Sequence, residues 1–275
     1  MRNGLLTGDR PLVLGHRGCS QRAPENTMAS FGMCVEDGID GVELDVHLCR
    51  TGELVVAHDS SLQRTAGVDR VIEETDFAEL RTYDIGSFKD PKFSDQRIPL
   101  LDEVFDAFSS RFVYDIELKS DIKTIKGNFP LAELTWKTIK DHHLEERVMV
   151  SSFNPMALRA FGLVCGRSVP TADIFCDAPS IPRILRHGAG RLISLSSYLK
   201  PMFDQVDEAW IRKYTRRLGY PVITWTVNDP AEARRLTEIG VNGLIGNDPM
   251  MLRDCVRAGH GDRQGLAPEN QRSGK

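Results

Sequence analysis

Short apolar runs alternate with segments of helical periodicity along nearly the whole chain. About eight of these runs have the length and composition of β-strands, and a further short extended piece covers 53–59. The strand candidates cover residues 12–15, 41–46, 112–119, 147–153, 169–175, 191–197, 221–227 and 243–247. This alternation is typical of parallel sheets flanked by helices, either a closed barrel or an open doubly wound sheet.

Helices are expected between the strand candidates. They cover residues 26–38, 133–144, 207–219, 230–240 and 251–259. Asn26 or Thr27 can cap the first helix, and Gly38 can end it. The segment 230–240 begins with proline and ends with glycine, which is the usual polarity of helix ends.

The positions of the polar residues favour a closed barrel over an open doubly wound sheet. These residues cluster at the C-terminal ends of many successive strand candidates, where a (β/α)8 barrel has its active face. We therefore predict a TIM-like (β/α)8 barrel that forms a single domain over residues 1–258. Residues 60–100 interrupt the alternation and carry few strand signals, so we expect a small inserted subdomain after the second strand. The polar, glycine-rich residues 259–275 are expected to form a disordered tail.

Charge and composition restrict the partners. The net charge is −4, so the bulk charge does not suggest nucleic-acid binding, and any anion selectivity must be local. No apolar run approaches the roughly 18 residues of a membrane span, so no stable membrane insertion is expected. The six cysteines are scattered without a CxxC pair, which is typical of reduced thiols in a cytoplasmic protein. The sequence leaves the oligomeric state open.

Three carboxylates predict a metal site. Glu43 and Asp45 lie two residues apart on a strand and so share a face. Two carboxylates in a barrel mouth repel each other unless a cation separates them. Glu117, on the third barrel strand, can complete an all-oxygen site that suits Mg²⁺ or Ca²⁺ better than zinc. The alternative is a solvated strand edge or an internal ion pair.

Two further residues on the third strand have different expected roles. Lys119 lies one strand repeat beyond Glu117 and can meet a phosphate oxygen as a point charge. Its alternative role is a salt bridge to Glu117. Asp115 lies deeper in the strand, and we expect it to be structural.

Two histidines lie where they can reach the same cavity. His16 directly follows the first strand candidate. His58 directly follows the short apolar run at residues 55–57. An imidazole titrates near neutral pH, so this pair can provide a general base and a general acid. Taken singly, each is more often an ordinary hydrogen-bonding group. The other histidines lack such neighbours and are expected to be surface or structural residues: His47, His142, His143, His187 and His260.

Other residues near the predicted mouth are candidates for substrate contact. Arg17 can donate two hydrogen bonds to a phosphate, or form an ion pair at the rim. Trp225 and Phe153 end strands and can pack against an alcohol group of a substrate, or simply belong to the core. Taken together, the metal ligands, histidines and cations indicate metal-assisted cleavage of a phosphate ester.

Several motifs occur in an order that resembles the glycerophosphodiester phosphodiesterase family. The similarity runs from Leu12 to about Asp248, which is most of the chain. The motifs are HRG, PENT, GVELDVHL, HD followed by L-x-RT, IELK, WTVN and GVNGLIGNDP. Each is weak alone, but the series is specific.

The resemblance implies a TIM-like barrel with a small insertion after the second strand. It implies a divalent ion held by Glu43, Asp45 and Glu117, and His16 and His58 as the acid/base pair. Arg17 and Lys119 would then lie near the phosphate. The implied substrates are glycerophosphodiesters, which are hydrolysed to sn-glycerol 3-phosphate and an alcohol.

The family often ends its last strand with a TDxP motif, whereas this chain has GNDP at 246–249. The contacts at that rim are therefore open.

Two rival functions remain. A lysophospholipase D-like activity would need an apolar channel for an acyl chain, and the 60–100 insertion shows no such hydrophobic loop. A non-catalytic barrel that binds phosphodiesters would bind without turnover.

Overall fold

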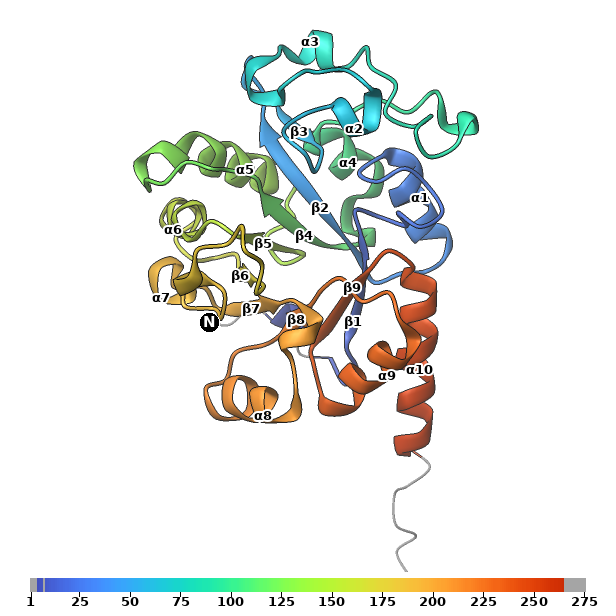
Figure 1. Ribbon diagram of the computed structural model, residues 1–275, viewed down its shortest axis with the longest axis vertical. Coiled ribbons are helices and arrows are strands. Elements are labelled where there is room, and N and C mark those ends of the chain that lie inside the picture. The colour runs from blue at the N-terminus through green and yellow to red at the C-terminus, as the bar shows by residue number, and fades with distance from the viewer. Residues whose placement is uncertain (1–3, 7, 265–275) are drawn as a thin grey trace, which may run out of the picture.

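The computed structural model describes residues 4–6 and 8–264 and shows a closed barrel of parallel strands (Figure 1). Eight strands follow the order β7-β6-β5-β4-β2-β1-β9-β8. They are β1 (Leu12–His16), β2 (Gly41–Leu48), β4 (Val113–Leu118), β5 (Val148–Ser152), β6 (Thr171–Phe175), β7 (Tyr198–Pro201), β8 (Ile223–Thr224) and β9 (Gly243–Gly246). Isolated parallel bridges between Leu199 and Val222 and between Met202 and Trp225 join β7 to β8. The predicted (β/α)8 barrel is therefore confirmed.

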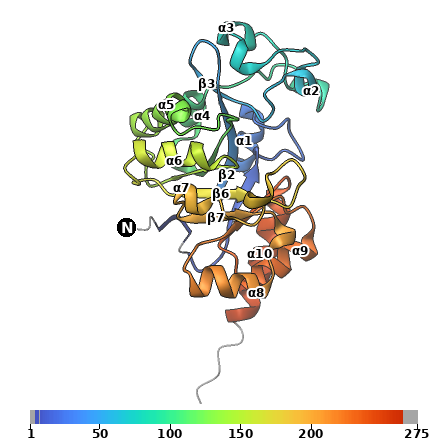
Figure 2. The same cartoon turned by 60° about the vertical axis from the view of Figure 1, so that its left-hand side comes forward.

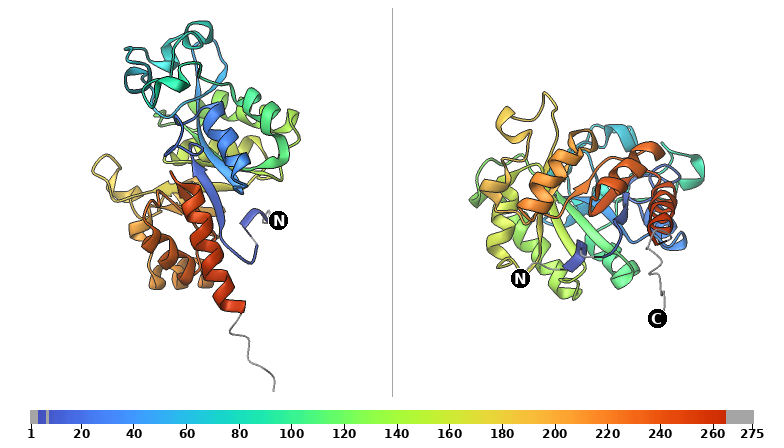
Figure 3. Two further views of the ribbon diagram at one scale, coloured as in Figure 1. Left: turned by 90° about the vertical axis from the view of Figure 1, so that its right-hand side faces the viewer. Right: turned by 90° about the horizontal axis from the view of Figure 1, so that it is seen from below.

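Helices surround the strands (Figure 2). The main ones are α1 (Met28–Glu36), α4 (Leu101–Phe108), α5 (Phe129–Asp141), α6 (Pro155–Val164), α7 (Arg191–Ser194), α8 (Glu208–Ile211), α9 (Pro230–Ile239) and α10 (Pro249–Gln264). Thr27 caps α1 by accepting a hydrogen bond from the backbone of Ser30, in a capping box. α8 continues into a π-helical turn over Arg212–Arg217, and α10 packs beside α9 and β1 (Figure 3). Among the described residues, no helix is long and apolar enough to cross a bilayer.

Apolar side chains close the barrel interior at one end. Leu14, Met149, Tyr198, Ile223 and Ile245 come from five different strands and form one buried cluster. Burying a large apolar side chain contributes about 1.5–3 kcal/mol, so this layer stabilises the closed barrel. Polar side chains such as Glu43, Asp45 and Glu117 are buried nearer the C-terminal ends of the strands. The barrel interior is thus apolar at one end and polar at its mouth.

The inserted segment has its own small core. β3 (Leu54–Val56) runs antiparallel to the end of β2, and α2 (Gln63–Ala66) and α3 (Phe77–Leu80) follow it at the top of Figure 1. Seven buried side chains form a separate cluster there: Cys49, Val55, Leu62, Ile72, Leu80, Ile85 and Ile98. The apolar residues that look dispersed in the sequence thus converge in space.

One predicted strand is wrong. Residues 191–197 form α7 and the turn after it, and the seventh barrel strand begins only at Tyr198. The carboxylate of Asp173 accepts a hydrogen bond from the backbone N–H of Arg191, which satisfies a donor in the first turn of the helix. The apolar side chains of this segment face solvent, so its hydrophobic run did not mark a buried strand.

The C-terminal boundary also differs from the expectation. α10 continues to Gln264, beyond the start predicted for the tail at residue 259. Residues 265–275 of that predicted tail lie outside the described residues.

Candidate active site

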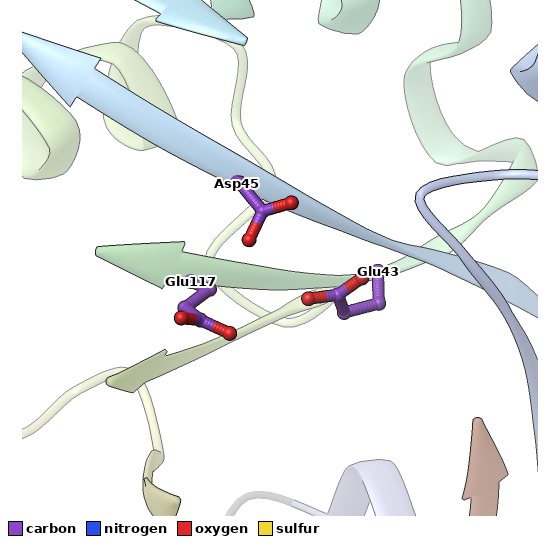
Figure 4. A group of neighbouring side chains, drawn as sticks. All are labelled: Glu43, Asp45 and Glu117. Carbon is purple, nitrogen blue, oxygen red and sulfur yellow. The ribbon is translucent and has the colours of Figure 1, made fainter. Parts of the chain in front are cut away.

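The barrel mouth brings together three buried carboxylates. Glu43 and Asp45 project from β2, and Glu117 projects from β4 toward them (Figure 4). The register pairs Asp45 with Glu117 across the two strands. One oxygen from each carboxylate lies within 4.8 Å of the other two. The predicted set is therefore assembled in one place, and its hard, closely spaced oxygen donors fit a divalent cation.

The carboxylates carry opposing pKa shifts. Burial, followed by the charge of Asp45, raises the pKa of Glu43. Burial would also raise the pKa of Asp45, but Lys119 and Arg17 hold it below its usual range. A buried carboxylate without a counter-charge is costly, so neighbouring cations are needed to keep these groups ionised.

Lys119 lies against this carboxylate set. Its Nζ is 2.6 Å from Glu117 and 2.9 Å from Asp45. Burial opposes its charge, but the two carboxylates raise its pKa above the usual range, so it stays a cation. The alternative salt bridge to Glu117 is thus formed, and it holds the ammonium group at the mouth.

A second lysine, which sequence reasoning did not identify, lies beneath the carboxylates. Lys200 on β7 is almost fully buried, and its Nζ is 2.7 Å from Asp115 and 3.7 Å from Glu43. Ser151 donates a 2.6 Å hydrogen bond to the other oxygen of Asp115. This pairing agrees with the structural role expected for Asp115. The sequence analysis did not identify Lys200, because it predicted the strand at residues 191–197 and β7 begins only at Tyr198.

His16 is oriented by Asn247, which lies in the GNDP run at the end of β9. Asn247 accepts a 2.7 Å hydrogen bond from His16 Nδ1, which leaves Nε2 unprotonated and 4.0 Å from Glu43. Burial, and then the charge of Arg17, lower the pKa of His16 to about 4. The imidazole is therefore neutral at physiological pH.

His58 is held by a hydrogen bond to Asp59, which belongs to a chain of ion pairs. Its Nδ1 donates to Asp59 at 2.6 Å, and Arg64 binds the other oxygen of Asp59 at 2.7 Å. Arg64 also binds Glu25, which accepts a 2.8 Å hydrogen bond from Arg17. The side chain of His58 is 33% exposed, so it remains accessible from the mouth.

The turn after β1 holds Arg17 in place. Arg17 has a left-handed backbone (φ 56°), and its N–H donates to Glu43 at 3.1 Å. Its Nε lies 3.5 Å from Asp45, which also accepts a 2.8 Å hydrogen bond from Asn26. The PENT motif therefore braces the site through Glu25 and Asn26, while its Thr27 caps α1.

Two aromatic residues lie at the same mouth. Phe153 and Trp225 pack edge to face with their ring centroids 5.4 Å apart. The indole N–H of Trp225 donates to the backbone of Lys200, which fixes the ring. Both rings are half-buried and so keep an accessible part.

Other proteins resemble this chain over most of its length. The model of the glycerophosphoryl diester phosphodiesterase family matches residues 16–251. A glycerophosphodiester phosphodiesterase of Caldanaerobacter subterraneus subsp. tengcongensis is 33% identical, over 91% of this chain and 99% of the relative. A human protein named lysophospholipase D GDPD1 is 28% identical, over 88% of this chain and 85% of that protein.

A solved structure agrees with the family. It is an Oleispira antarctica phosphodiesterase in complex with the product sn-glycerol-3-phosphate, with a TM-score of 0.80 and 27% identity. The match covers 92% of this chain and 99% of that one. The family match spans far more than half of the sequence, and the barrel has the same fold. The chain therefore belongs to the glycerophosphoryl diester phosphodiesterase family, whose members are phosphoric diester hydrolases.

Proposed function

We propose that this protein hydrolyses glycerophosphodiesters to sn-glycerol 3-phosphate and an alcohol, with a bound Mg²⁺ or Ca²⁺ ion. The observation that carries the proposal is the buried set of Glu43, Asp45 and Glu117 beside a neutral histidine. Membership of the family and the product bound in the Oleispira antarctica phosphodiesterase support the choice of substrate class.

Glu43, Asp45 and Glu117 would hold the cation. When bound, it supplies Lewis-acid polarisation of the phosphate and offsets the charge of its ligands. Lys119 and the N–H of Arg17 already contact these ligands and fix their positions. Arg17 and Lys119 also carry the positive charge that stabilises the developing charge on the phosphate oxygens.

The histidines divide the proton transfers. His16 is neutral, with its Nδ1 hydrogen committed to Asn247, so its Nε2 accepts a proton from the attacking hydroxyl group. His58, held by Asp59, delivers a proton to the departing alcohol. The nucleophile is water or the glycerol 2-hydroxyl group. Phe153 and Trp225 pack against the substrate at the edge of the mouth.

The test is release of glycerol 3-phosphate from glycerophosphocholine, with added Mg²⁺ or Ca²⁺ and after EDTA treatment. His16→Ala and His58→Ala should each lower kcat by at least ~100-fold, because general acid/base catalysis contributes about 10²–10⁴. His142→Ala is the matched control, since that ring contacts Asp102 and Phe105 away from the carboxylates. Full activity of His16→Ala or of the metal-free protein would refute the proposal, and tight binding without turnover would favour the non-catalytic barrel.

A further inference from the structure

One sector of the barrel differs in charge from the rest. Residues 178–228, which include α7, β7 and α8, hold eight Lys or Arg and three Asp or Glu, so their net charge is +5. The remaining residues hold 27 Lys or Arg and 36 Asp or Glu, so their net charge is −9. The chain is thus acidic overall but strongly basic over residues 178–228, which we call the basic sector.

Most of the basic side chains in this sector lie at the surface. The π-helical turn after α8 carries four exposed ones, and Arg183 is exposed before α7. Arg191, at the start of α7, lies 5.4 Å and 6.0 Å from the ring centroids of Tyr214 and Tyr220. α7 and the π-helical turn are therefore neighbours, at the left and lower left of Figure 1. Within the described residues, the salt bridges include none from Arg183 or from the four basic residues of the turn: Arg212, Lys213, Arg216 and Arg217.

Exposed apolar side chains are concentrated in the same sector. Five of the eight large hydrophobic residues that are exposed in the described part of the chain belong to it: Ile184, Leu192, Ile193, Leu195 and Leu218. Leu192 is 66% exposed on α7, and Leu218 is 45% exposed directly after the π-helical turn. Apolar side chains that gather at the surface mark an interaction site, whereas single ones do not.

Charge and polarity together select the partner. A nucleic acid would match the positive charge, but its phosphates gain nothing from exposed leucine side chains. A second copy that docked through the same sector would bring two net charges of +5 together. The surface of an anionic bilayer matches both features, because its head groups attract Lys and Arg while its acyl boundary accepts leucine and isoleucine.

We propose that the basic sector binds reversibly to the surface of a bilayer that contains anionic phospholipids. The exposed leucines and isoleucines enter the boundary between head groups and acyl chains, and the arginines meet the lipid phosphates. This is binding at the surface, which needs no spanning helix. The side chains involved are separate from the three carboxylates and the two histidines of the proposed active site. The inference therefore goes beyond the proposed function and does not depend on it.

Vesicle flotation measures this binding. Vesicles of equal parts phosphatidylglycerol and phosphatidylcholine are compared with vesicles of phosphatidylcholine alone. The protein should float with the anionic vesicles at low ionic strength and dissociate at about 1 M salt, where the Debye length falls to about 3 Å. The double variant Arg216→Gln/Arg217→Gln should lower the partition coefficient roughly 25-fold, because each basic residue near an anionic surface contributes about 1 kcal/mol, or about fivefold. Leu192→Asp should lower it by about tenfold or more, because a leucine side chain no longer leaves water.

Two variants elsewhere on the surface are the matched controls. Arg257→Gln removes an exposed arginine of α10, and Phe88→Asp replaces a side chain that is 42% exposed in the inserted segment. Neither should change the partition coefficient. All the substituted side chains are exposed or adjacent to solvent, so each variant should fold, which circular dichroism checks.

The outcomes decide the proposal without any measurement of hydrolysis. Absence of binding to the anionic vesicles, equal binding to both kinds of vesicle, or equal losses in the control variants overturns it. A concentration-dependent dimer in sedimentation that Leu192→Asp abolishes, without vesicle binding, overturns it in favour of a second copy of the chain.

Discussion

Replacing Lys200 with methionine tests whether a buried cation keeps the carboxylates of the barrel together. Methionine has nearly the same length but no charge. The substitution leaves Asp115, 2.7 Å away, without its counter-ion, while Glu43 loses a neighbouring positive charge. Removing one partner of a buried ion pair costs about 3–5 kcal/mol, because the remaining charge stays buried.

Thermal unfolding followed by circular dichroism measures this cost. A cost of 1 kcal/mol lowers Tm by about 2–4 °C in domains of 150–250 residues, so Lys200→Met should lower it by roughly 6–20 °C. The measurement is made in EDTA, so that no added cation replaces the lost charge. The double variant with Asp115→Asn should be less destabilised than the sum of the single variants, by about 2 kcal/mol, because the two residues contact each other.

A surface lysine provides the control. Lys137→Met breaks an ion pair to Asp141, but both partners are exposed, so Tm should stay close to that of the wild type. If Lys200→Met unfolds within about 2 °C of the wild type, or if the double variant shows simple additivity, Lys200 does not hold the carboxylates in place.

Three further predictions concern pH and packing. Asn247→Asp puts a carboxylate beside His16 and so raises the imidazole pKa from about 4, which should move the acid limb of kcat/KM to higher pH; a limb that does not move contradicts this. Burial raises the pKa of Asp173 to about 7, so the folded state holds its proton between about pH 4 and 7 and this group's stabilisation falls as pH rises through that range. The free energy of unfolding in urea should therefore change in favour of Asp173→Asn over the wild type when the pH is raised from 5 to 8. The same difference between variant and wild type at both pH values would refute the raised pKa. Gly41→Ala puts a Cβ 2.0 Å from a backbone oxygen of β4 and should cost at least about 1–3 kcal/mol, whereas Gly32→Ala in α1 meets no atom within 4 Å and should not destabilise.

The carboxylate cluster could be predicted because it depends on two regular rules. Alternation along a strand puts Glu43 and Asp45 on one face, and parallel strands bring Glu117 to the same end of the barrel. The structure adds only the register, which sets Asp45 opposite Glu117.

Lys200 and Asn247 could not be predicted as readily. The apolar side chains of residues 191–197 are exposed, so their hydrophobicity led to a strand prediction where the chain forms a short helix. A buried lysine such as Lys200 has no sequence pattern of its own. Asn247 lies 231 residues from its partner His16, and only closure of the barrel brings them together. Contacts across a closed barrel depend on the whole topology, which local periodicity does not contain.

The ion pairs around Glu25 have a consequence for protein engineering. Arg64 belongs to the inserted segment, yet through Glu25 it reaches Arg17 and through Asp59 it reaches His58. A chimera that exchanges residues 60–100 for the loop of another barrel would remove a counter-ion shared by both sides of the mouth. The insertion is therefore not an interchangeable module, and any graft must supply an arginine at the position of Arg64.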